Sequence, residues 1–375
     1  MKYNIIIFLC ILFATSGLRL SAQKYGTITM EEVSRTHYRK EILLPDIPGY
    51  LTLKCDFHIH TVYSDGTVWP TVRIGEAWED GLDAIAITDH IEEHPRKLPG
   101  QKHAAYEIAQ PAAMMSDIIL VKGGEISRSM PPGHFNALFV TDVNALNMPD
   151  YMDAIGEAVK QGGFIIWNHP GWRKQQPDTT VWMAEHEAIY KRGWMHGIEI
   201  FNEKEWYPES IRWSMERDLA ITGNSDVHDF YENYYDENKF PVRPLTLVFA
   251  KERTMESLRE AMFARRTATL FFNMLVGRKE LITSLVEQSV KIMPPHHYQD
   301  GYLYFTVRNL SDIEFTFIKK STDKSELPAK FVLPCRGSLI LKAKQAEGQT
   351  QDYTWDLKNV LTGVDQNYEY RMSVR

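Results

Sequence analysis

Short apolar runs alternate with longer amphipathic stretches through most of this chain, and that alternation constrains the fold more than any other feature. The runs have strand length and occupy residues 51–57, 84–88, 118–122, 137–140, 164–168, 197–201 and 220–222, with a further one at 245–250. The stretches with helical spacing occupy residues 68–80, 151–161, 181–192, 209–218 and 254–266. Gly81, Gly162 and Gly193 stand where C-terminal helix caps belong. The pattern predicts an α/β domain with parallel strands.

The pattern changes near residue 284, where shorter strand-like segments separated by polar turns begin. Candidate strands lie at residues 302–307, 315–318, 331–333, 338–341 and 368–374. Alternation of apolar and polar residues along a strand is typical of an antiparallel sheet with one buried face. We therefore expect two domains, residues 23–283 and residues 284–375, the second a small antiparallel β domain of sandwich-like form.

The first 22 residues are typical of a secretory signal peptide. Lys2 precedes an apolar run at residues 5–14, which is much shorter than the roughly 20 residues of a membrane-spanning helix. Small residues Ser21 and Ala22 supply a cleavage point. We expect an exported protein, periplasmic or secreted, with no transmembrane span after residues 1–22 are removed; an uncleaved amphipathic anchor is the alternative. Cys55 and Cys335, the cysteines outside this segment, are expected to be buried, unpaired thiols.

The charge balance limits the partners. The chain has 42 Lys and Arg residues against 49 Asp and Glu residues, a formal net charge of −7. Residues 1–22 contain Lys2 and Arg19 and no acidic residue, so their removal changes the charge to −9. This balance argues against a stable nucleic-acid complex or adhesion to an acidic membrane. Any anionic ligand must be bound by a local positive site.

Residues able to bind a metal ion follow, or closely flank, almost every strand-like run of the large domain. They are His58, His60, Asp65, His90, Glu125, His134, His169, Asp226 and His228. Loops at the carboxyl ends of parallel strands meet at one face of a barrel, so these residues can converge although they are distant in sequence. A single histidine is more often a hydrogen-bonded core residue, and an acidic residue after a strand often caps a helix. Nine such residues in register with the strands favour a metal centre.

The spacing within two of these motifs supports the same interpretation. His58 and His60 are two residues apart on a strand-like segment, so both imidazoles point to the same face. Asp226 and His228 repeat that spacing at the other end of the domain, where strand closure would bring the two pairs together. Imidazole and carboxylate ligands suit Zn, Mn or Fe better than Ca or Mg.

These motifs resemble, in order, those of the PHP (polymerase and histidinol phosphatase) superfamily. The matching segments are Asp56-Phe57-His58-Ile59-His60-Thr61, Tyr63-Ser64-Asp65-Gly66, Ile87-Thr88-Asp89-His90, Gly123-Gly124-Glu125, Asn168-His169-Pro170-Gly171 and Asn224-Ser225-Asp226-Val227-His228. The resemblance covers about residues 51–228. It implies a distorted (β/α)7 barrel of TIM-like form with two or three divalent metal ions and hydrolysis of phosphate esters.

The resemblance also implies how the ligands are shared. One metal would take His58, His60, Glu125 and Asp226. A second would share Glu125 and add His134 and His169, and a third would take Asp65, His90 and His228. His134 stands in the least distinctive stretch of sequence, just before its strand rather than after it.

The chemistry of such a centre predicts an enzyme, a phosphoric ester hydrolase. Three divalent ions exceed the charge of the carboxylates of Asp65, Glu125 and Asp226, so the site stays locally positive in an acidic chain. We expect metal-bound hydroxide to attack phosphorus directly. Catalytic roles fall to Asp226 and His228, in proton transfer, and to Glu125, as the bridging residue.

The substrate contacts are less sharply indicated. Arg128 and Arg173 follow strand-like runs and are candidates for gripping phosphate oxygens, or ordinary exposed arginines. Asn202 is a hydrogen-bond donor to substrate or a helix cap. Aromatic residues 206–207, 230–231 and 234–235 would wall a pocket or pack under loops. We expect a small phosphodiester or phosphomonoester as substrate. The alternatives are an amidohydrolase-like carbonyl hydrolase, which also opens with His-x-His, and a noncatalytic secreted protein that binds metal or glycan.

Overall fold

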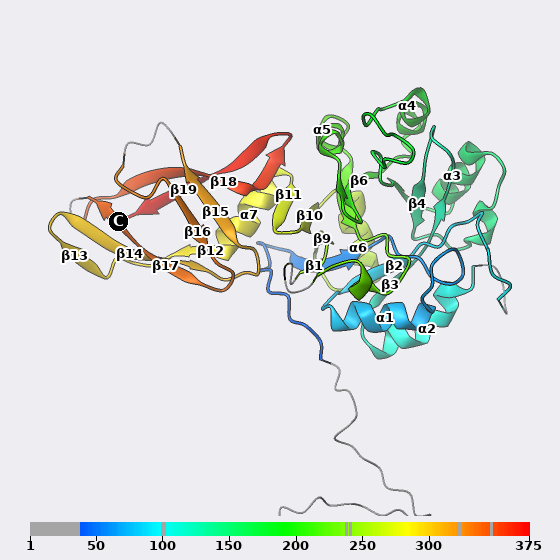
Figure 1. The fold of residues 1–375 in the computed structure, drawn as a ribbon, viewed down its shortest axis with the longest axis horizontal. Helices are drawn as coiled ribbons and strands as arrows, with labels where there is room; N and C mark the ends of the chain where they lie inside the picture. The colour runs from blue at the N-terminus through cyan, green and yellow to red at the C-terminus, as the bar shows by residue number, and fades with distance from the viewer. Residues whose placement is uncertain (1–37, 99–102, 237–238, 240–241, 321–324, 346–347) are drawn as a thin grey trace, which may run out of the picture. The chain divides into compact units, whose positions relative to one another are not determined.

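The computed structural model describes residues 38–98, 103–236, 239, 242–320, 325–345 and 348–375 (Figure 1). The predicted signal peptide, residues 1–22, lies outside the described residues. Every helix in the described part of the chain falls short of the length and apolarity that a membrane span requires.

The predicted α/β architecture is confirmed in residues 51–277. Its strands are β1 (Leu51–Asp56), β2 (Ala84–Ile87), β3 (Ile119–Ile126), β4 (Phe135–Leu138), β5 (Phe164–Trp167), β6 (Gly197–Asn202), β7 (Glu205–Trp206), β8 (Ala220–Asn224), β9 (Leu245–Ala250), β10 (Thr267–Phe271) and β11 (Met274–Gly277). The pairs β1–β2, β2–β3, β5–β6 and β6–β8 are parallel.

Not every strand is parallel, which corrects the sequence-based expectation. Strand β4 pairs antiparallel with both β3 and β5, and β9 pairs antiparallel with β1 and β10. The link from Ile126 to Phe135 is too short for a helical crossover, so β4 must turn back beside β3. Because β4 runs backward, its first residues lie where the other strands end.

The helices follow the predicted stretches with ends shifted by a few residues. They are α1 (Pro70–Glu79), α2 (Ala105–Met115), α3 (Tyr151–Lys160), α4 (Ala184–Lys191), α5 (Pro208–Glu216), α6 (Met255–Phe263) and α7 (Lys279–Ser289), with short 3-10 turns η2 (Asn144–Leu146) and η3 (Tyr231–Asn233). Side chains fix the starts of two of them, since Asp150 accepts from Met152 N at α3 and Thr254 from Ser257 N at α6. The three predicted cap glycines have φ near +70° to +80°.

Helices α2 and α7 escaped sequence-based prediction. Helix α2 contains Pro111, and proline in a sequence usually indicates the end of a helix. Helix α2 packs against α1 (Figure 1). Helix α7 runs through residue 284, where the sequence pattern places the domain boundary. The division into residues 23–283 and 284–375 stays a prediction.

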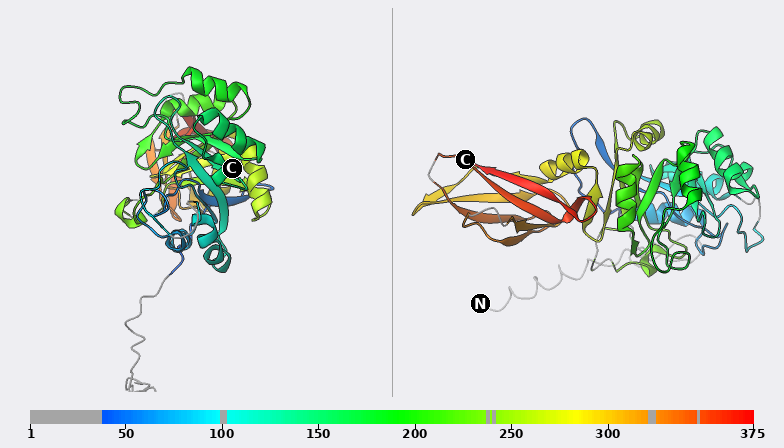
Figure 2. Two further views of the ribbon diagram at one scale, coloured as in Figure 1. Left: turned by 90° about the vertical axis from the view of Figure 1, so that its right-hand side faces the viewer. Right: turned by 90° about the horizontal axis from the view of Figure 1, so that it is seen from above.

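The C-terminal strands form two sheets, as the alternating pattern indicates. In one sheet, β14 (Tyr302–Asn309) pairs with β12 (Val290–Ile292), β13 (His297–Gln299) and β17 (Ser338–Lys344). In the other, β15 (Phe315–Lys319) lies between β16 (Lys330–Leu333) and β18 (Gln351–Gly363), and β18 also pairs with β19 (Gln366–Val374). Figure 2 shows β18 and β19 as long red strands running alongside each other. Strand β18 also pairs in parallel with β11, so this sheet is continuous with the α/β sheet.

The strands that hold the candidate site are deeply buried. Every residue of β2, β5, β6 and β8 is buried. A polar group on such a strand needs a partner or a ligand, because leaving it unpaired costs about 1–3 kcal/mol. Of the two thiols, Cys55 is buried as expected, whereas Cys335 is exposed because it lies at a turn after β16, which corrects that expectation.

Candidate metal centre

Two of the predicted motifs lie side by side beyond the ends of β1 and β8. Ile59 and Val227 form a parallel bridge. Asp226 N donates to His58 O at 2.8 Å, and His60 N donates to Val227 O at 3.0 Å. The backbone therefore brings together the His-x-His and Asp-x-His pairs from opposite ends of the α/β region.

The first group of side chains surrounds Asp226. Its Oδ1 lies 3.1 Å from His58 Nε2 and 3.0 Å from His60 Nε2. Nε2 of His58 also lies 3.3 Å from Glu125 Oε1. Ligand atoms of His58, His60 and Asp226 all lie within 4.8 Å of one another, a spacing suited to one ion.

The second group surrounds Glu125, at the end of β3. Oε1 lies 3.1 Å from His134 Nδ1 and 3.5 Å from His169 Nε2, while Oε2 lies 2.6 Å from His90 Nδ1. The two carboxylate oxygens thus face different histidines. His134 reaches the cluster because β4 is antiparallel and starts at this edge, which explains why this residue precedes its strand.

The third group surrounds Asp65, in the loop after β1. Its Oδ1 lies 3.5 Å from His90 Nε2 and 3.2 Å from His228 Nε2. His60 joins the same group, with all four ligand atoms within 4.8 Å of one another. The structure therefore brings all nine predicted residues into one continuous cluster.

Four buried atoms of this cluster fit a bound cation. Nε2 of His58, Nε2 of His60, Oδ1 of Asp65 and Oδ1 of Asp226 are buried. Although Asp226 Oδ1 lies 3.0–3.1 Å from the two imidazole nitrogens, none of the four atoms makes a hydrogen bond of acceptable geometry in the described part of the chain. Buried polar atoms are otherwise nearly always satisfied. Nitrogen and carboxylate oxygen are the donors that transition metals and zinc prefer, so the residues present fit divalent ions.

The electrostatics of the cluster are strongly perturbed. Burial opposes the charged form of His58, but Asp226, Glu199 and Glu125 outweigh it and raise its pKa well above the usual value. Burial likewise opposes the charged form of His90, and Glu125 and Asp65 raise its pKa to about 11. His60, which is buried beside His228 and His90, has its pKa lowered to about 3. The buried carboxylates thus demand compensating positive charge.

Comparison with known proteins identifies the family of this chain. A solved two-domain protein from Bacteroides vulgatus, described as containing a predicted PHP-like metal-dependent phosphoesterase, is 40% identical and superposes with a TM-score of 0.87. The match covers 90% of this chain and 100% of that one. The chain belongs to the PHP family. No protein-family model and no curated protein matched it.

Two more distant structures resemble parts of this PHP chain. A proposed metal-dependent phosphoesterase from Bifidobacterium adolescentis is 18% identical over 46% of this chain and 87% of its own, with a TM-score of 0.38. An amidohydrolase from Chromobacterium violaceum with bound sulfate and no metal is 16% identical over 48% and 89%, with a TM-score of 0.35. These likenesses are too weak to support an argument about fold or function.

Behind the nine-residue cluster of this PHP chain lies a carboxylate that sequence reasoning missed. Glu199, in the middle of β6, accepts from His58 Nδ1 (3.0 Å), Asn202 Nδ2 (2.8 Å), Asn224 Nδ2 (2.8 Å) and His169 N (2.8 Å). Holding His58 Nδ1 turns Nε2 toward the cluster. A lone Glu in the otherwise apolar run of residues 197–201 was the available signal.

A second buried network fixes the two motif loops. Asp89 accepts from Thr61 N, Thr61 Oγ1 and Ser64 Oγ, each at 2.6 Å, and so orders the loop between His60 and Asp65. Asp56 accepts from Ser225 N at 3.1 Å and from Arg243 Nη2 at 2.6 Å, which fixes the residue before Asp226.

The predicted substrate contacts lie in different settings. Arg128 is ion-paired with Glu92 and donates to Met148 O at 2.7 Å. Arg173 is 87% exposed, with Nε 3.7 Å from Glu205 Oε1. Asn202 is buried behind His58, where its amide donates to Glu199. Contact of Arg128, Arg173 and Asn202 with substrate stays a prediction.

Three of the six aromatic residues proposed as a pocket wall are buried, Trp206 and Tyr234 are partly buried, and Phe230 is exposed. Tyr231 and Tyr235 are buried in a hydrophobic cluster, and Tyr207 is 4% exposed. Tyr234 is only partly buried, and its hydroxyl accepts from His228 N at 3.2 Å. Trp172, which follows β5, lies with its ring 5.2 Å from that of His169.

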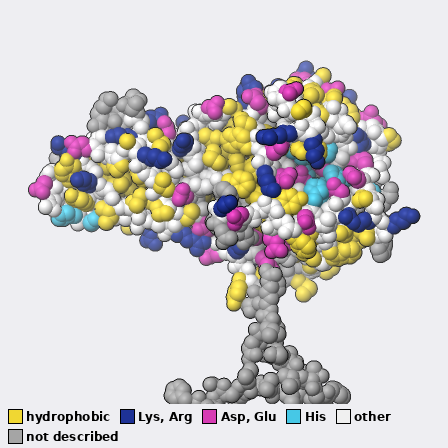
Figure 3. Space-filling model, viewed as in Figure 1, with side chains coloured by type: hydrophobic (Ala, Val, Ile, Leu, Met, Phe, Trp, Pro, Cys, Tyr) yellow, Lys and Arg dark blue, Asp and Glu magenta, His cyan; other side chains and the backbone are white. Residues whose placement is uncertain are grey.

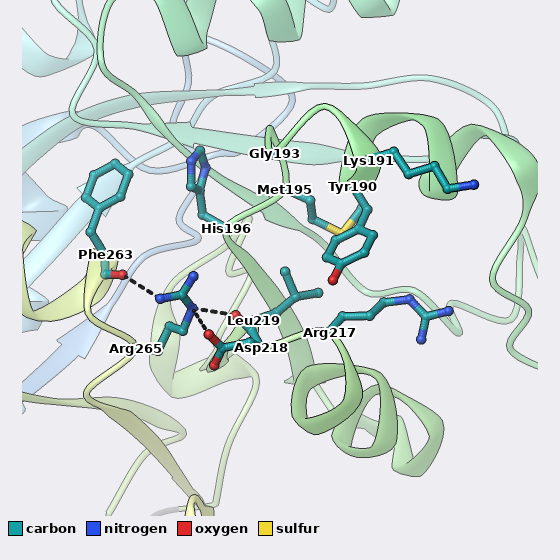
Figure 4. Close-up of a pocket in the computed structure, with 10 residues that line it drawn as sticks. All are labelled: Tyr190, Lys191, Gly193, Met195, His196, Arg217, Asp218, Leu219, Phe263 and Arg265. Carbon is teal, nitrogen blue, oxygen red and sulfur yellow. Dashed lines mark hydrogen bonds and ion pairs between the residues drawn. The ribbon is translucent and has the colours of Figure 1, made fainter.

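A separate cavity of about 470 Å³ lies at the amino-terminal ends of β6 and β8 (Figure 4). None of the nine predicted ligands lines it. Its charged groups already have partners, because Asp218 lies 3.1 Å from Arg265 Nε and 3.0 Å from Arg278 Nη2. This cavity is distinct from the candidate metal centre.

Proposed function

We propose that this PHP protein hydrolyses small phosphodiesters or phosphomonoesters at two or three divalent ions held by the nine-residue cluster. The observation that carries the proposal is the convergence of buried, unpaired donor atoms from separate loops on one place. Membership of the PHP family supports the same activity. Zn, Mn or Fe are the ions that this donor set favours.

The three groups of side chains support three ion positions. In the arrangement that the family resemblance implies, His58, His60, Glu125 and Asp226 would hold one ion, Glu125, His134 and His169 a second, and Asp65, His90 and His228 a third. Glu125 is suited to bridging, because its two oxygens face different histidines. Bound divalent ions lower the pKa of a coordinated water and offset the charge of a phosphate.

The protein's own residues would position and move protons around the phosphate. Glu199, which accepts a hydrogen bond from Asn202, holds His58 in one orientation. The His228 side chain is 31% exposed, whereas that of Asp226 is 12% exposed, so His228 is placed to exchange a proton with solvent. In the reaction, water oxygen bonds to phosphorus, the bond from phosphorus to the leaving oxygen breaks, and a proton passes to that oxygen, aided by Asp226 or His228.

Two further proposals concern the chain as a whole. We propose that β1 to β6 and β8, without the two-residue β7, close into a distorted seven-stranded barrel, supported by the Ile59–Val227 bridge. We also propose that residues 1–22 direct export to the periplasm or the medium.

Assays with purified protein and added Zn, Mn or Fe test the function. p-Nitrophenyl phosphate and bis(p-nitrophenyl) phosphate should be turned over, and lactones and amides should not. In ¹⁸O-labelled water the phosphate product should gain one label. Turnover of the carbonyl compounds alone would establish the carbonyl hydrolase instead, and label found only in the alcohol would exclude direct attack on phosphorus.

A further inference from the structure

Two lysines flank the candidate metal centre, each lying over an aromatic ring. Lys174 Nζ lies 5.0 Å from the centroid of the Trp172 ring, and Lys204 Nζ lies 5.5 Å from that of Tyr234. Both lysines are exposed. An ammonium over a ring face is attracted by the ring and is held in a defined place.

The two rings contact opposite ends of the ligand cluster. Trp172 lies beside His169 and His134, with centroid distances of 5.2 and 5.9 Å. The Tyr234 hydroxyl contacts His228 N, next to the group around Asp65. The lysines therefore extend the positive region beyond both ends of the cluster. In Figure 3, Lys and Arg side chains are visible around the histidines of this face.

The backbones that carry the lysines are held in place. Lys204 belongs to the two-residue link between β6 and β7, and the preceding carbonyl, Glu203 O, accepts from Tyr235 Oη at 2.7 Å. Trp172 lies in a loop closed by hydrogen bonds from Trp172 N to His169 O and from Gln176 N to Trp172 O.

A close approach also fixes this loop. A Cβ added at Gly171 would lie 2.4 Å from Thr180 Oγ1 and 2.6 Å from Tyr207 Cδ1, so only glycine fits there. The loop that carries Trp172 and Lys174 is therefore closely packed at its base.

The charges of these lysines are available to a ligand. In the described part of the chain, neither ammonium forms an ion pair with a carboxylate within 4.0 Å. The neighbouring arginines differ, because Arg128 is paired with Glu92, and Arg96 donates to Ser64 O and Gly66 O. Glu203, next to Lys204 in sequence, lies beyond ion-pair distance, although Lys204 acts on its pKa and opposes the increase that burial and Asp226 cause.

We propose that the preferred substrates are phosphodiesters with an anionic group on each side of the scissile phosphate, as in an internal link of a phosphodiester-linked chain. This rests on the proposed phosphoesterase function. Lys174 binds the anion on the His134 and His169 side, and Lys204 binds the anion on the His228 side. Each exposed pair contributes about threefold in affinity, so the two together favour the doubly flanked substrate by roughly tenfold.

A matched substrate series tests the proposal with the full-length, metal-loaded protein. The probes are the thymidine dinucleotide with one internal phosphodiester, the same compound with a 5′-phosphate, with a 3′-phosphate, and with both. The wild type should show kcat/KM increasing along the series by roughly tenfold in total. Lys174→Ala and Lys204→Ala should each remove the gain from one terminal phosphate, and the Arg substitutions should restore it.

The control is Lys160→Ala, which removes an exposed lysine on α3 and should retain the wild-type ratio. The gain should also fall with ionic strength, because exposed charges are screened. A flat series in the wild type, or a gain unchanged in both lysine variants, would overturn this inference while hydrolysis of the unflanked dinucleotide still upheld the proposed function. Failure to hydrolyse any phosphate ester would overturn both.

Discussion

Polar and charged residues at the two ends of strands β6 and β8 differ in whether the protein supplies their hydrogen-bond partners. At the amino-terminal ends, His196 accepts a hydrogen bond from Ile165 N, and Asp218 is paired with two arginines. At the carboxyl ends, atoms of Asp226 and of the facing histidines are buried without a hydrogen-bond partner in the described part of the chain. In a purely structural site the buried polar groups hydrogen-bond to one another, whereas a ligand-binding site keeps polar atoms without protein partners.

The histidines show the same contrast. Burial, Arg265 and Arg259 lower the pKa of His196 to about 4. Burial also disfavours charge on His90, but Glu125 and Asp65 reverse the effect and raise its pKa to about 11. The same imidazole group is therefore neutral at one end of the sheet and surrounded by carboxylates at the other.

The largest expected effect is the loss of Asp226. We expect Asp226→Asn to lower kcat for phosphate esters by roughly 10²–10⁴-fold, the range of a proton-transfer group. The matched control is Glu232→Gln, an exposed carboxylate in the 3-10 turn η3. Equal activity of Asp226→Asn and the wild type would show that the carboxyl ends of β6 and β8 are not the catalytic site.

Metal binding should stabilise the protein. An ion that binds only the folded chain adds about 2.7 kcal/mol to the free energy of unfolding at 100 times its Kd. Urea titration with and without Mn or Zn measures this, and Ca should stabilise less because it prefers oxygen ligands. An unchanged urea midpoint with every transition metal would contradict a metal centre at the carboxyl ends.

Removing the carboxylate behind His58 should weaken metal binding without deleting a ligand. We expect Glu199→Gln to raise the metal Kd by about 10–100-fold, the usual effect of a residue that orients a ligand. Competition with a chelator measures the Kd. Glu256→Gln, which changes an exposed carboxylate on α6, is the control and should match the wild type. A wild-type Kd in Glu199→Gln would show that His58 needs no such support.

The smallest effect concerns His196. Its pKa is about 4 in the folded chain and 6.5 when unperturbed, so the unfolded state binds an extra proton between these pH values. Stability should be fully present above pH 6.5 and fall by about 1–3 kcal/mol toward pH 4. His196→Gln should show a shallower loss over this range in urea titrations, with metal content unchanged. If the free energy of unfolding fell equally steeply with pH in His196→Gln and the wild type, His196 would not be the source of the acid destabilisation.

The sequence predicted the strands and the side chains that converge at one edge of the sheet, because both follow local patterns. His58 and His60 on one strand, and Asp226 and His228 on another, are visible as spacing alone. The antiparallel orientation of β4 was not predicted, because a run of four buried residues looks the same in a parallel and in an antiparallel strand. Glu199 was missed because its importance depends on His58, Asn202 and His169, which only the folded chain brings together.

The most direct test of the metal centre is the metal content of the purified protein, measured by inductively coupled plasma mass spectrometry after dialysis. We predict two or three divalent transition-metal ions per wild-type chain, a clear loss in His58→Ala, and full content in His196→Ala, the buried histidine at the other end of the sheet. A wild-type chain that retains no ion after loading with Zn, Mn or Fe, or equal content in all three proteins, would contradict the proposed site.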